Sequence, residues 1–178
     1  MARFDVLRPV LAAWLIALPV AVAAQSADRS SIGAQYGVDS DFSRYTLNYE
    51  TAPWWSRATS LGRFALQGEF GVSYWHARHR GEDARRSAWQ ASAIPMFRWW
   101  LTDRFYLEAG IGLTLFNHTR LGEHELSTAL QFGDHLGLGY QITENWRLGL
   151  RVSHFSNAGI KRPNRGLNAY QLGVSWQW

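Results

Sequence analysis

The sequence predicts an all-β protein, an eight-stranded antiparallel transmembrane β-barrel of the bacterial outer membrane. Apolar and polar residues alternate with period 2 along most of the 178-residue chain, which is the pattern of strands with two different faces. Aromatic residues make up 15% of the chain and include 10 Trp, many of them near the ends of the alternating segments. Outer-membrane barrels carry aromatic girdles at such positions, so the two observations together favour a barrel.

The alternation divides into eight segments, one for each expected strand. Large apolar side chains occupy one face, and Gly, Ser, Gln, Glu and Arg occupy the other. In a membrane barrel the apolar face contacts lipid, and the narrow lumen holds small and polar side chains. In the alternative, a soluble lipocalin-like barrel, the large apolar face would point inward. The expected strands are 29–38, 43–52, 62–77, 86–101, 104–117, 125–141, 145–156 and 167–178.

Local signals define the first four strands. Asp39-Ser40-Asp41 is a turn sequence between the first two segments. In the third segment, apolar residues recur at nearly every second position from Phe64 to Tyr74, and Arg80-Gly81-Glu82-Asp83 separates it from the fourth. The fourth contains Pro95, where we expect an edge or a bulge because proline cannot donate to a β-ladder.

The last four strands are equally well delimited. The fifth follows Thr102-Asp103 and alternates from Phe105 to Leu115. Leu121-Gly122-Glu123 precedes the sixth strand, and Thr143-Glu144-Asn145 precedes the seventh. The eighth ends at Trp178, an aromatic C-terminal residue that resembles the ending of bacterial outer-membrane proteins.

The polar face of the segments carries charges of both signs. Eight strands enclose a lumen that side chains just fill, so charges within it should neutralise one another. If both termini lie in the periplasm, the odd-numbered connections are extracellular, and the longest of them is expected at 157–166. The charged residues expected in the lumen are Glu69, Glu108, Arg98, Arg147 and Arg151.

The N-terminus has the composition of a signal peptide. A basic start precedes the apolar stretch 10–24, which ends in Val22-Ala23-Ala24, a suitable cleavage site. This stretch is shorter than the ~20 residues that a membrane-spanning helix needs, which argues against a membrane anchor. We therefore expect residues 1–24 to be a signal peptide and residues 25–178 to form the barrel as a single domain.

Charge and cysteine content exclude several other classes of protein. The chain has 18 basic and 14 acidic residues, but the basic residues are scattered and form no helical stripe. Nucleic acid is therefore not expected as a partner. The chain contains no cysteine, which excludes a disulfide scaffold and a thiolate metal site.

Two polar residues continue the lipid-facing side of the seventh segment. Leu150 and Val152 are followed on the same face by His154 and Ser156, because residues i and i+2 of a strand share a face. A histidine beside a serine is a pair that can activate a hydroxyl for attack on an acyl carbon. Polar residues also occur where a strand simply reaches the headgroup region, so the spacing alone leaves both interpretations open.

The segment His154–Asn168, HFSNAGIKRPNRGLN, resembles the active-site motif of the lipid A 3-O-deacylase (PagL) family, His-x-Ser-Asn-Ala-Gly followed by Pro-Asn-x-Gly. The resemblance implies an eight-stranded outer-membrane barrel that hydrolyses the acyl chain ester-linked at the 3-position of lipid A. It implies that Ser156 is the nucleophile and His154 the general base, without a metal or an organic cofactor. It also implies that Asn157 and Asn164 stabilise the oxyanion or shape the loop.

The same resemblance implies how the substrate is held. Lipid A of the outer leaflet approaches sideways among the outer-membrane lipids, and a homodimer is compatible with this arrangement. Its phosphates would be held by three basic residues of the last loop, Lys161, Arg162 and Arg165. Its acyl chain would lie in a groove on the lipid-facing wall, with Leu148, Leu150, Val152, Tyr170 and Leu172 as candidate lining residues.

The chain departs from the family pattern at one position. The family has a glutamate as triad acid twelve residues beyond the serine, and here that position is Asn168. An amide can orient an imidazole but cannot stabilise an imidazolium by charge. Asp134 is a second candidate for the orienting role if the turn between the sixth and seventh strands is centred near Thr143–Glu144; otherwise its role is structural.

Two other functions stay open on the sequence. A non-catalytic barrel in adhesion or membrane stability would use the same fold, with His154 and Ser156 only interfacial. Another lipid-acting enzyme, such as a phospholipase or an acyltransferase, would use the same serine. The sequence contains no Walker loop, no GxGxxG and no GxSxG, so phosphoryl transfer, hydride transfer and the α/β-hydrolase layout are not supported.

Overall fold

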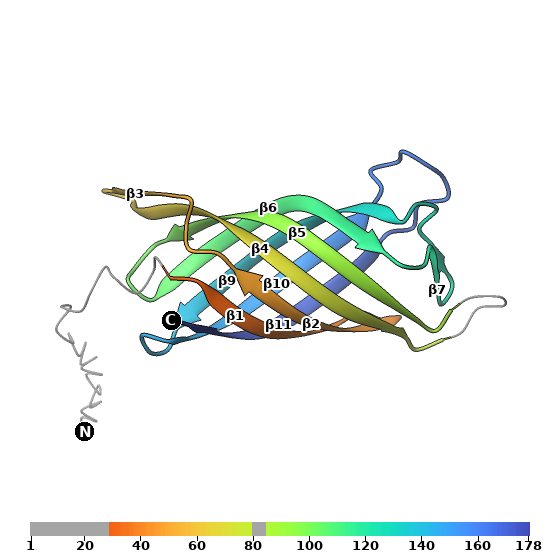
Figure 1. The fold of residues 1–178 in the computed structure, drawn as a ribbon, viewed down its shortest axis with the longest axis horizontal. Helices are drawn as coiled ribbons and strands as arrows, with labels where there is room; N and C mark the ends of the chain where they lie inside the picture. The colour runs from red at the N-terminus through yellow and green to blue at the C-terminus, as the bar shows by residue number, and fades with distance from the viewer. Residues whose placement is uncertain (1–28, 80–84) are drawn as a thin grey trace, which may run out of the picture.

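The computed structural model describes residues 29–79 and 85–178, which form an antiparallel β-barrel (Figure 1). The predicted signal peptide, residues 1–24, lies outside the described residues. Three short strands accompany the wall: β3 (Trp55–Thr59), β7 (Arg120–Leu121) and β8 (His124–Glu125). The strands of the wall are β1 (Ser31–Val38), β2 (Phe42–Glu50), β4 (Gly62–Ala77), β5 (Ser87–Trp100), β6 (Phe105–Phe116), β9 (Leu130–Gln141), β10 (Trp146–Ser156) and β11 (Leu167–Gln177).

Strand pairing closes the wall into a ring of eight strands. The hydrogen-bonded order is β2-β1-β11-β10-β9-β6-β5-β4, and β4 pairs in turn with β2. Closure leaves no free edge among these strands, whereas β3 pairs along β4 beyond the end of β2. Figure 1 shows the C-terminus and β3 at one end of the barrel, the terminal end, and β7 at the other. We call this other end the loop end; it carries the connections 39–41, 117–129 and 157–166.

The eight predicted strands are confirmed, seven of them to within two residues at each end. The prediction for the sixth was wrong at its start, because β9 begins at Leu130 and not at residue 125. Residues 120–125 form the β7–β8 hairpin instead, and the next residue, Leu126, is fully buried. The connection 117–129 is therefore longer than 157–166, contrary to expectation. The five-residue strand β3 was not predicted, because it is too short for a period to be read and all of it is exposed.

Pro95 lies within β5 and interrupts its pairing with β6. The ladder stops after Ala93↔Leu113 and resumes at Met96↔Gly110 in the same register, so the feature is a gap and not the expected edge or bulge. Pairing with β4 continues without a break. The barrel thus accommodates the missing N–H of proline by losing ladder bonds on one side only.

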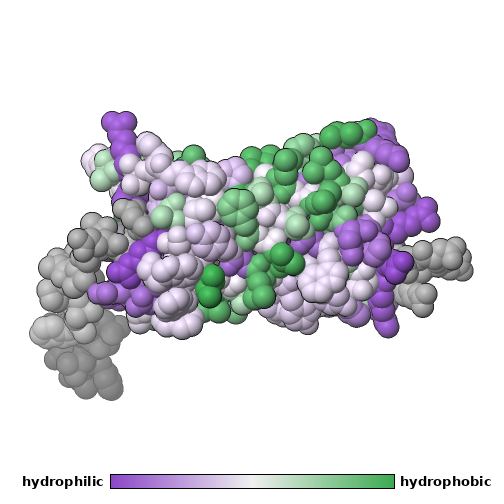
Figure 2. Space-filling model, viewed as in Figure 1, coloured by the Kyte–Doolittle hydropathy of each residue, from purple (hydrophilic) through white to green (hydrophobic). Residues whose placement is uncertain are grey.

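The outer face of the barrel is apolar. Side chains at alternate positions of the strands are exposed, for example Leu47 at 71% and Leu136 at 67%. Figure 2 shows hydrophobic residues gathered over the middle of the barrel and hydrophilic residues towards its two ends. Such a band is the surface that a bilayer covers. Across residues 29–79 and 85–178, no helix is long and apolar enough to cross a membrane.

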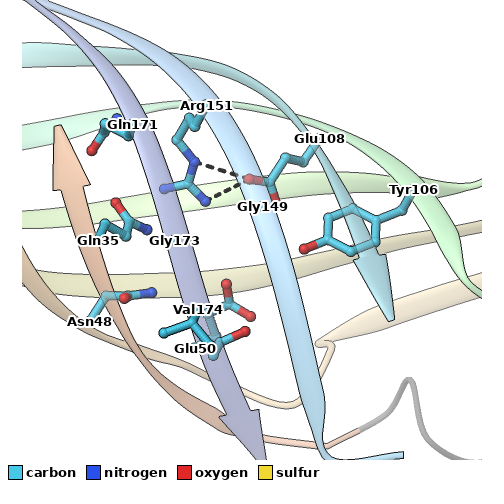
Figure 3. A pocket seen from close by; sticks show the side chains of 11 residues that line it. Gln35, Asn48, Glu50, Tyr106, Glu108, Gly149, Arg151, Gln171, Gly173 and Val174 are labelled. Carbon is cyan, nitrogen blue, oxygen red and sulfur yellow. Dashed lines mark hydrogen bonds and ion pairs between the residues drawn. The ribbon is translucent and has the colours of Figure 1, made fainter. Parts of the chain in front are cut away.

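The lumen holds the predicted network of charges, and Figure 3 shows one part of it, the pair Arg151 and Glu108. Arg98 lies 2.8 Å from Glu108, and Arg151 lies 2.7 Å from both Glu69 and Glu108. Sequence reasoning missed Glu50, which pairs with Arg98 and Arg147. A polar cavity of about 30 Å³ beside the network has room for about two water molecules. These buried charges are thus paired, which is the condition for keeping them out of bulk water.

An apolar cluster fills the lumen at the loop end. Its members come from six strands and from the connection 117–129: Phe42, Trp75, Ala77, Ala88, Phe116, Leu121, Leu126, Phe155, Leu167 and Ala169. Phe155 is fully buried, and its ring centroid lies 5.4 Å from that of Trp75. Because Phe155 points inward from β10, its two neighbours on the strand must point outward. The cluster therefore fixes the end of β10 from inside the barrel.

Candidate active site

His154 and Asn168 face each other on the outer surface near the loop end. They are register partners on β10 and β11, and the Nδ1 of His154 lies 2.8 Å from the Oδ1 of Asn168. A carboxamide oxygen can only accept, so the hydrogen of the neutral imidazole is on Nδ1. Nε2 then carries the lone pair, which is the form that a general base needs.

Ser156 is the last residue of β10 and shares the outer face with His154. Both side chains are half-buried. The hydroxyl oxygen of Ser156 accepts a hydrogen bond from the Ala158 N–H at 3.5 Å, the limit for such a bond. Among the described residues, no hydrogen bond joins Ser156 to His154. Catalytic hydrogen bonds are often long in the absence of substrate, so this geometry does not rule the pair out.

Asn157 holds the loop that follows Ser156. Its side chain is buried, and its Nδ2 donates to the carbonyl oxygens of Leu126 and Lys161 at 3.0 and 2.9 Å. Its Oδ1 accepts from the N–H of Gly159 at 2.9 Å. All of these partners are backbone groups of connections at the loop end, so the amide of Asn157 is engaged in shaping the loop.

Asn164 belongs to the same loop and bonds to the loop backbone through its side-chain oxygen. Its Oδ1 accepts from the backbone N–H of Asn157 at 3.3 Å, and among the described residues no acceptor bonds to its Nδ2. Ala158 and Gly159 follow with φ of 53° and 79°, so the chain turns sharply just after Ser156. A left-handed conformation costs a non-glycine residue about 1–2 kcal/mol, and such strain is common at functional sites.

Asp134 lies beside His154 on the strand opposite to Asn168. The register of β9 and β10 pairs the two residues directly, close to the position expected from the turn at Thr143–Glu144. The hydrogen bond of the imidazole nevertheless goes to Asn168. The structure thus brings both candidate orienting residues next to the histidine and joins one of them to it.

The three basic residues of the loop are exposed at its surface. Lys161 and Arg162 lie near the tip, and Arg165 donates from Nη1 to the carbonyl oxygen of Glu123 at 3.4 Å. All three belong to the connection 157–166, which follows Ser156 directly. The loop that follows Ser156 thus carries three basic side chains at the loop end.

Two residues near the site were not identified from the sequence. Gly166 lies against the imidazole, because a Cβ at this position would be 2.8 Å from Cε1 of His154. His124 reaches the carbonyl oxygen of Gly166 from the connection 117–129. The only signals in the sequence were a glycine in a loop and one histidine among six, and neither indicates a tertiary contact.

The outer face contains a second histidine with serines beside it. His76 on β4 pairs in register with Ser43 on β2 and Ser87 on β5. A histidine next to a serine on the outer wall is therefore not distinctive in itself. His154 differs from His76 in its hydrogen bond to the carboxamide of Asn168. It also differs in the hydrogen-bonded loop that follows the neighbouring Ser156.

The candidate lining residues of the acyl groove are all exposed on the outer wall: Leu148, Leu150, Val152, Tyr170 and Leu172. Leu148 and Leu172 also line a hollow together with residues of β1, β2, β4 and β5. The five side chains form part of the apolar outer wall on β10 and β11.

Comparison with known proteins places the chain in a family. The model of the family described as "Lipid A 3-O-deacylase (PagL)" matches residues 41–177. The chain is 46% identical over 173 residues to the lipid A deacylase PagL of Bordetella bronchiseptica, covering 96% of each chain. It is 34% identical over 153 residues to the lipid A deacylase PagL of Pseudomonas aeruginosa, covering 84% of this chain and 85% of the relative.

A solved structure supports the same assignment. The crystal structure of the outer membrane enzyme PagL superposes with a TM-score of 0.68 and 30% sequence identity, covering 82% of this chain and 97% of that chain. The family match covers most of the described barrel, including the strands β10 and β11 and the loop between them. The chain therefore belongs to the lipid A 3-O-deacylase (PagL) family.

Proposed function

We propose that this protein is an outer-membrane esterase that hydrolyses the 3-O-linked acyl chain of lipid A, with Ser156 as nucleophile and His154 as general base. The observation that carries the proposal is the hydrogen bond between His154 and Asn168 on the outer wall. It fixes the tautomer in which Nε2 can accept a proton, two residues from a serine at the end of a strand. The family to which the chain belongs supplies the substrate class.

The first half of the reaction forms an acyl-enzyme. The Oγ of Ser156 attacks the ester carbonyl carbon, and its proton passes to Nε2 of His154. The tetrahedral intermediate collapses as the bond to the 3-oxygen of lipid A breaks. The imidazolium returns its proton to that oxygen, which leaves as a hydroxyl. In the second half a water molecule attacks the acyl-serine by the same route, which releases the free fatty acid and restores Ser156.

Asn164 is the proposed side-chain donor to the oxyanion, while Asn157 shapes the loop. The division rests on their hydrogen bonds: the amide of Asn157 is engaged with backbone groups, whereas Asn164 uses its oxygen and has an N–H₂ left to donate. The N–H of Ala158, which already points at Ser156 Oγ, is a second donor. A donor of this kind typically contributes about 2.7–4 kcal/mol to lowering the barrier.

The proposed site faces the outer leaflet, with the loop end at the cell surface and the termini in the periplasm. Lipid A then reaches Ser156 from the side, with its acyl chain along the apolar wall below His154. Water enters from the loop end. Lys161, Arg162 and Arg165 are the proposed contacts to the phosphates of lipid A. A homodimer remains part of the proposal, and cross-linking in membranes tests it.

A non-catalytic barrel and another lipid-acting enzyme are the competing functions. Membership of a deacylase family disfavours the first, and the match along most of the chain to proteins named lipid A deacylase disfavours the second. Comparing lipid A with a phospholipid as substrate for the purified protein separates the deacylase from a phospholipase.

The test is mass spectrometry of lipid A from cells that produce the wild-type protein, Ser156→Ala or His154→Ala. We expect loss of one 3-hydroxyacyl mass with the wild type only. Matched controls are Ser43→Ala and His76→Ala, which remove a half-buried serine and histidine from the outer face at the same end of the barrel. These should retain the activity. The proposal would be refuted if the Ser156→Ala protein still deacylated lipid A. It would also be refuted if the folded wild-type protein did not deacylate purified lipid A in detergent.

A further inference from the structure

His124 lies between two connections at the loop end. It begins β8, and its Nδ1 lies 3.0 Å from the carbonyl oxygen of Gly166, the last residue of the loop 157–166. Its Nε2 lies 3.3 Å from Oδ2 of Asp41 in the connection between β1 and β2. One imidazole thus connects three segments that are far apart in the sequence.

Gly166 contacts both His124 and the proposed general base, His154. Its Cα is packed against the imidazole of His154, since a Cβ there would lie 2.8 Å from Cε1 and 3.3 Å from Nε2. Gly166 has φ of 65°, a conformation that glycine adopts without strain. The position of this backbone therefore limits where the Cε1–Nε2 edge of the His154 ring can lie.

Both partners of His124 are acceptors of hydrogen bonds. A carbonyl oxygen and a carboxylate only accept, so each of these bonds needs a hydrogen on the ring nitrogen that makes it. The ring also packs edge-on against Phe42 of the apolar cluster, with centroids 4.8 Å apart. Besides Asp41, the titratable groups nearby are His79 and Glu123, which line a small cavity with His124, and Glu125, which pairs with Arg120.

From these contacts we infer that His124 is a positioning residue for the deacylation reaction. It ties Gly166 to Asp41 and so holds the backbone against which the ring of His154 rests. The inference depends on the proposed role of His154 and extends it to a residue 30 positions earlier in the chain. The contacts of His124 are with Gly166, Asp41 and Phe42, so its effect on His154 passes through Gly166.

Two substitutions separate positioning from packing. His124→Phe keeps a ring against Phe42 and removes both hydrogen bonds. His124→Asn loses the ring but keeps an amide N–H at the position of Nδ1, from which it can donate to the carbonyl oxygen of Gly166. Purified proteins are compared with lipid A in detergent, and folding is checked by heat-modifiable mobility on gels.

If His124 positions the site, His124→Phe lowers kcat about tenfold, because the ring of His154 is displaced. KM changes little, because the residues that contact the substrate stay in place. His124→Asn should stay within about threefold of wild-type kcat. A wild-type kcat for His124→Phe, or an equal loss in both variants, would overturn the inference. If His124→Phe does not fold, His124→Leu, which also removes both hydrogen bonds, takes its place; it should lower kcat, and an unchanged kcat would count equally against the inference.

Ser156→Ala and His118→Ala are measured alongside. An active Ser156→Ala protein would show that the proposed function itself is wrong. An inactive Ser156→Ala protein together with a fully active His124→Phe protein would refute the role of His124 alone. His118→Ala removes a histidine from the same connection and should retain wild-type kcat, so a loss there would indicate a general effect of altering this connection.

Discussion

His154 and Asn168 face each other across β10 and β11, with Nδ1 of the histidine 2.8 Å from Oδ1 of the asparagine. An asparagine in this place orients the imidazole and fixes its tautomer, as a carboxylate would. It provides no negative charge to stabilise the imidazolium that the proposed mechanism forms when Ser156 gives up its proton. The proposed site therefore has an uncharged residue in the place of a triad acid.

Substitutions of Asn168 separate orientation from charge. Asn168→Ala should lower kcat at least about tenfold, because the ring loses its tautomer and its direction. Asn168→Glu should restore the hydrogen bond and add charge. A carboxylate favours the protonated ring, so the neutral base appears only at higher pH, and the acid limb of the kcat/KM profile should move to higher pH. An unshifted limb in Asn168→Glu would contradict this role.

Asp134→Asn tests the other neighbour of His154. Asp134 is in register with the histidine, but the hydrogen bond of the ring goes to Asn168. We expect Asp134→Asn to retain more than about half of the wild-type kcat, since a half-buried carboxylate without a direct bond to the ring contributes little. A loss as large as that of Asn168→Ala, measured in the same assay, would show that Asp134 is the orienting residue.

Gly166→Ala and Gly159→Ala form a matched pair. Both glycines lie in the loop 157–166 with positive φ, so alanine strains the backbone at either position by about 1 kcal/mol. Only at Gly166 would the new methyl group meet His154; at Gly159 nothing lies within 4 Å. Gly166→Ala should therefore lose much more activity than Gly159→Ala at equal folded fraction. Equal losses would mean that contact with the imidazole is not what matters.

The lumen network predicts a change in stability without a change in the site. Arg98→Met leaves Glu50 and Glu108 short of a partner, and breaking a buried pair in this way costs about 3–5 kcal/mol. Urea unfolding of the detergent-solubilised barrel measures it as a lower midpoint. Arg57→Met on the exposed strand β3 is the control and should leave the midpoint unchanged. Equal midpoints for the two variants would show that the lumen pairs do not support the barrel.

The barrel itself was predictable because its determinants are local. Alternation with period 2 and turn sequences such as Thr143-Glu144-Asn145 mark the strands, and the large apolar face identifies the lipid side. The start of β9 was not predictable in this way. Leu126 continues the apolar pattern but is buried in the cluster at the loop end, a tertiary contact that a local period cannot distinguish from a strand.

The candidate site was predictable to the extent that it follows the chain. His154 and Ser156 share a face by strand geometry, and the approach of His154 to Asn168 follows from the pairing of β10 with β11. The contacts of His124 and Gly166 were not predictable, because they depend on how two long connections fold over the end of the barrel. The different tasks of Asn157 and Asn164 likewise depend on hydrogen bonds that spacing does not specify.

The most direct test of the account is labelling of the purified wild-type protein with a long-chain alkyl fluorophosphonate, followed by peptide mass spectrometry. The reagent forms a stable tetrahedral adduct with an activated serine. We predict that the adduct is on Ser156, that its extent matches the loss of lipid A deacylation, and that His154→Ala abolishes it while Ser43→Ala does not. Full labelling of Ser156 with deacylation retained, or inactivation with the adduct elsewhere, would contradict the central claim.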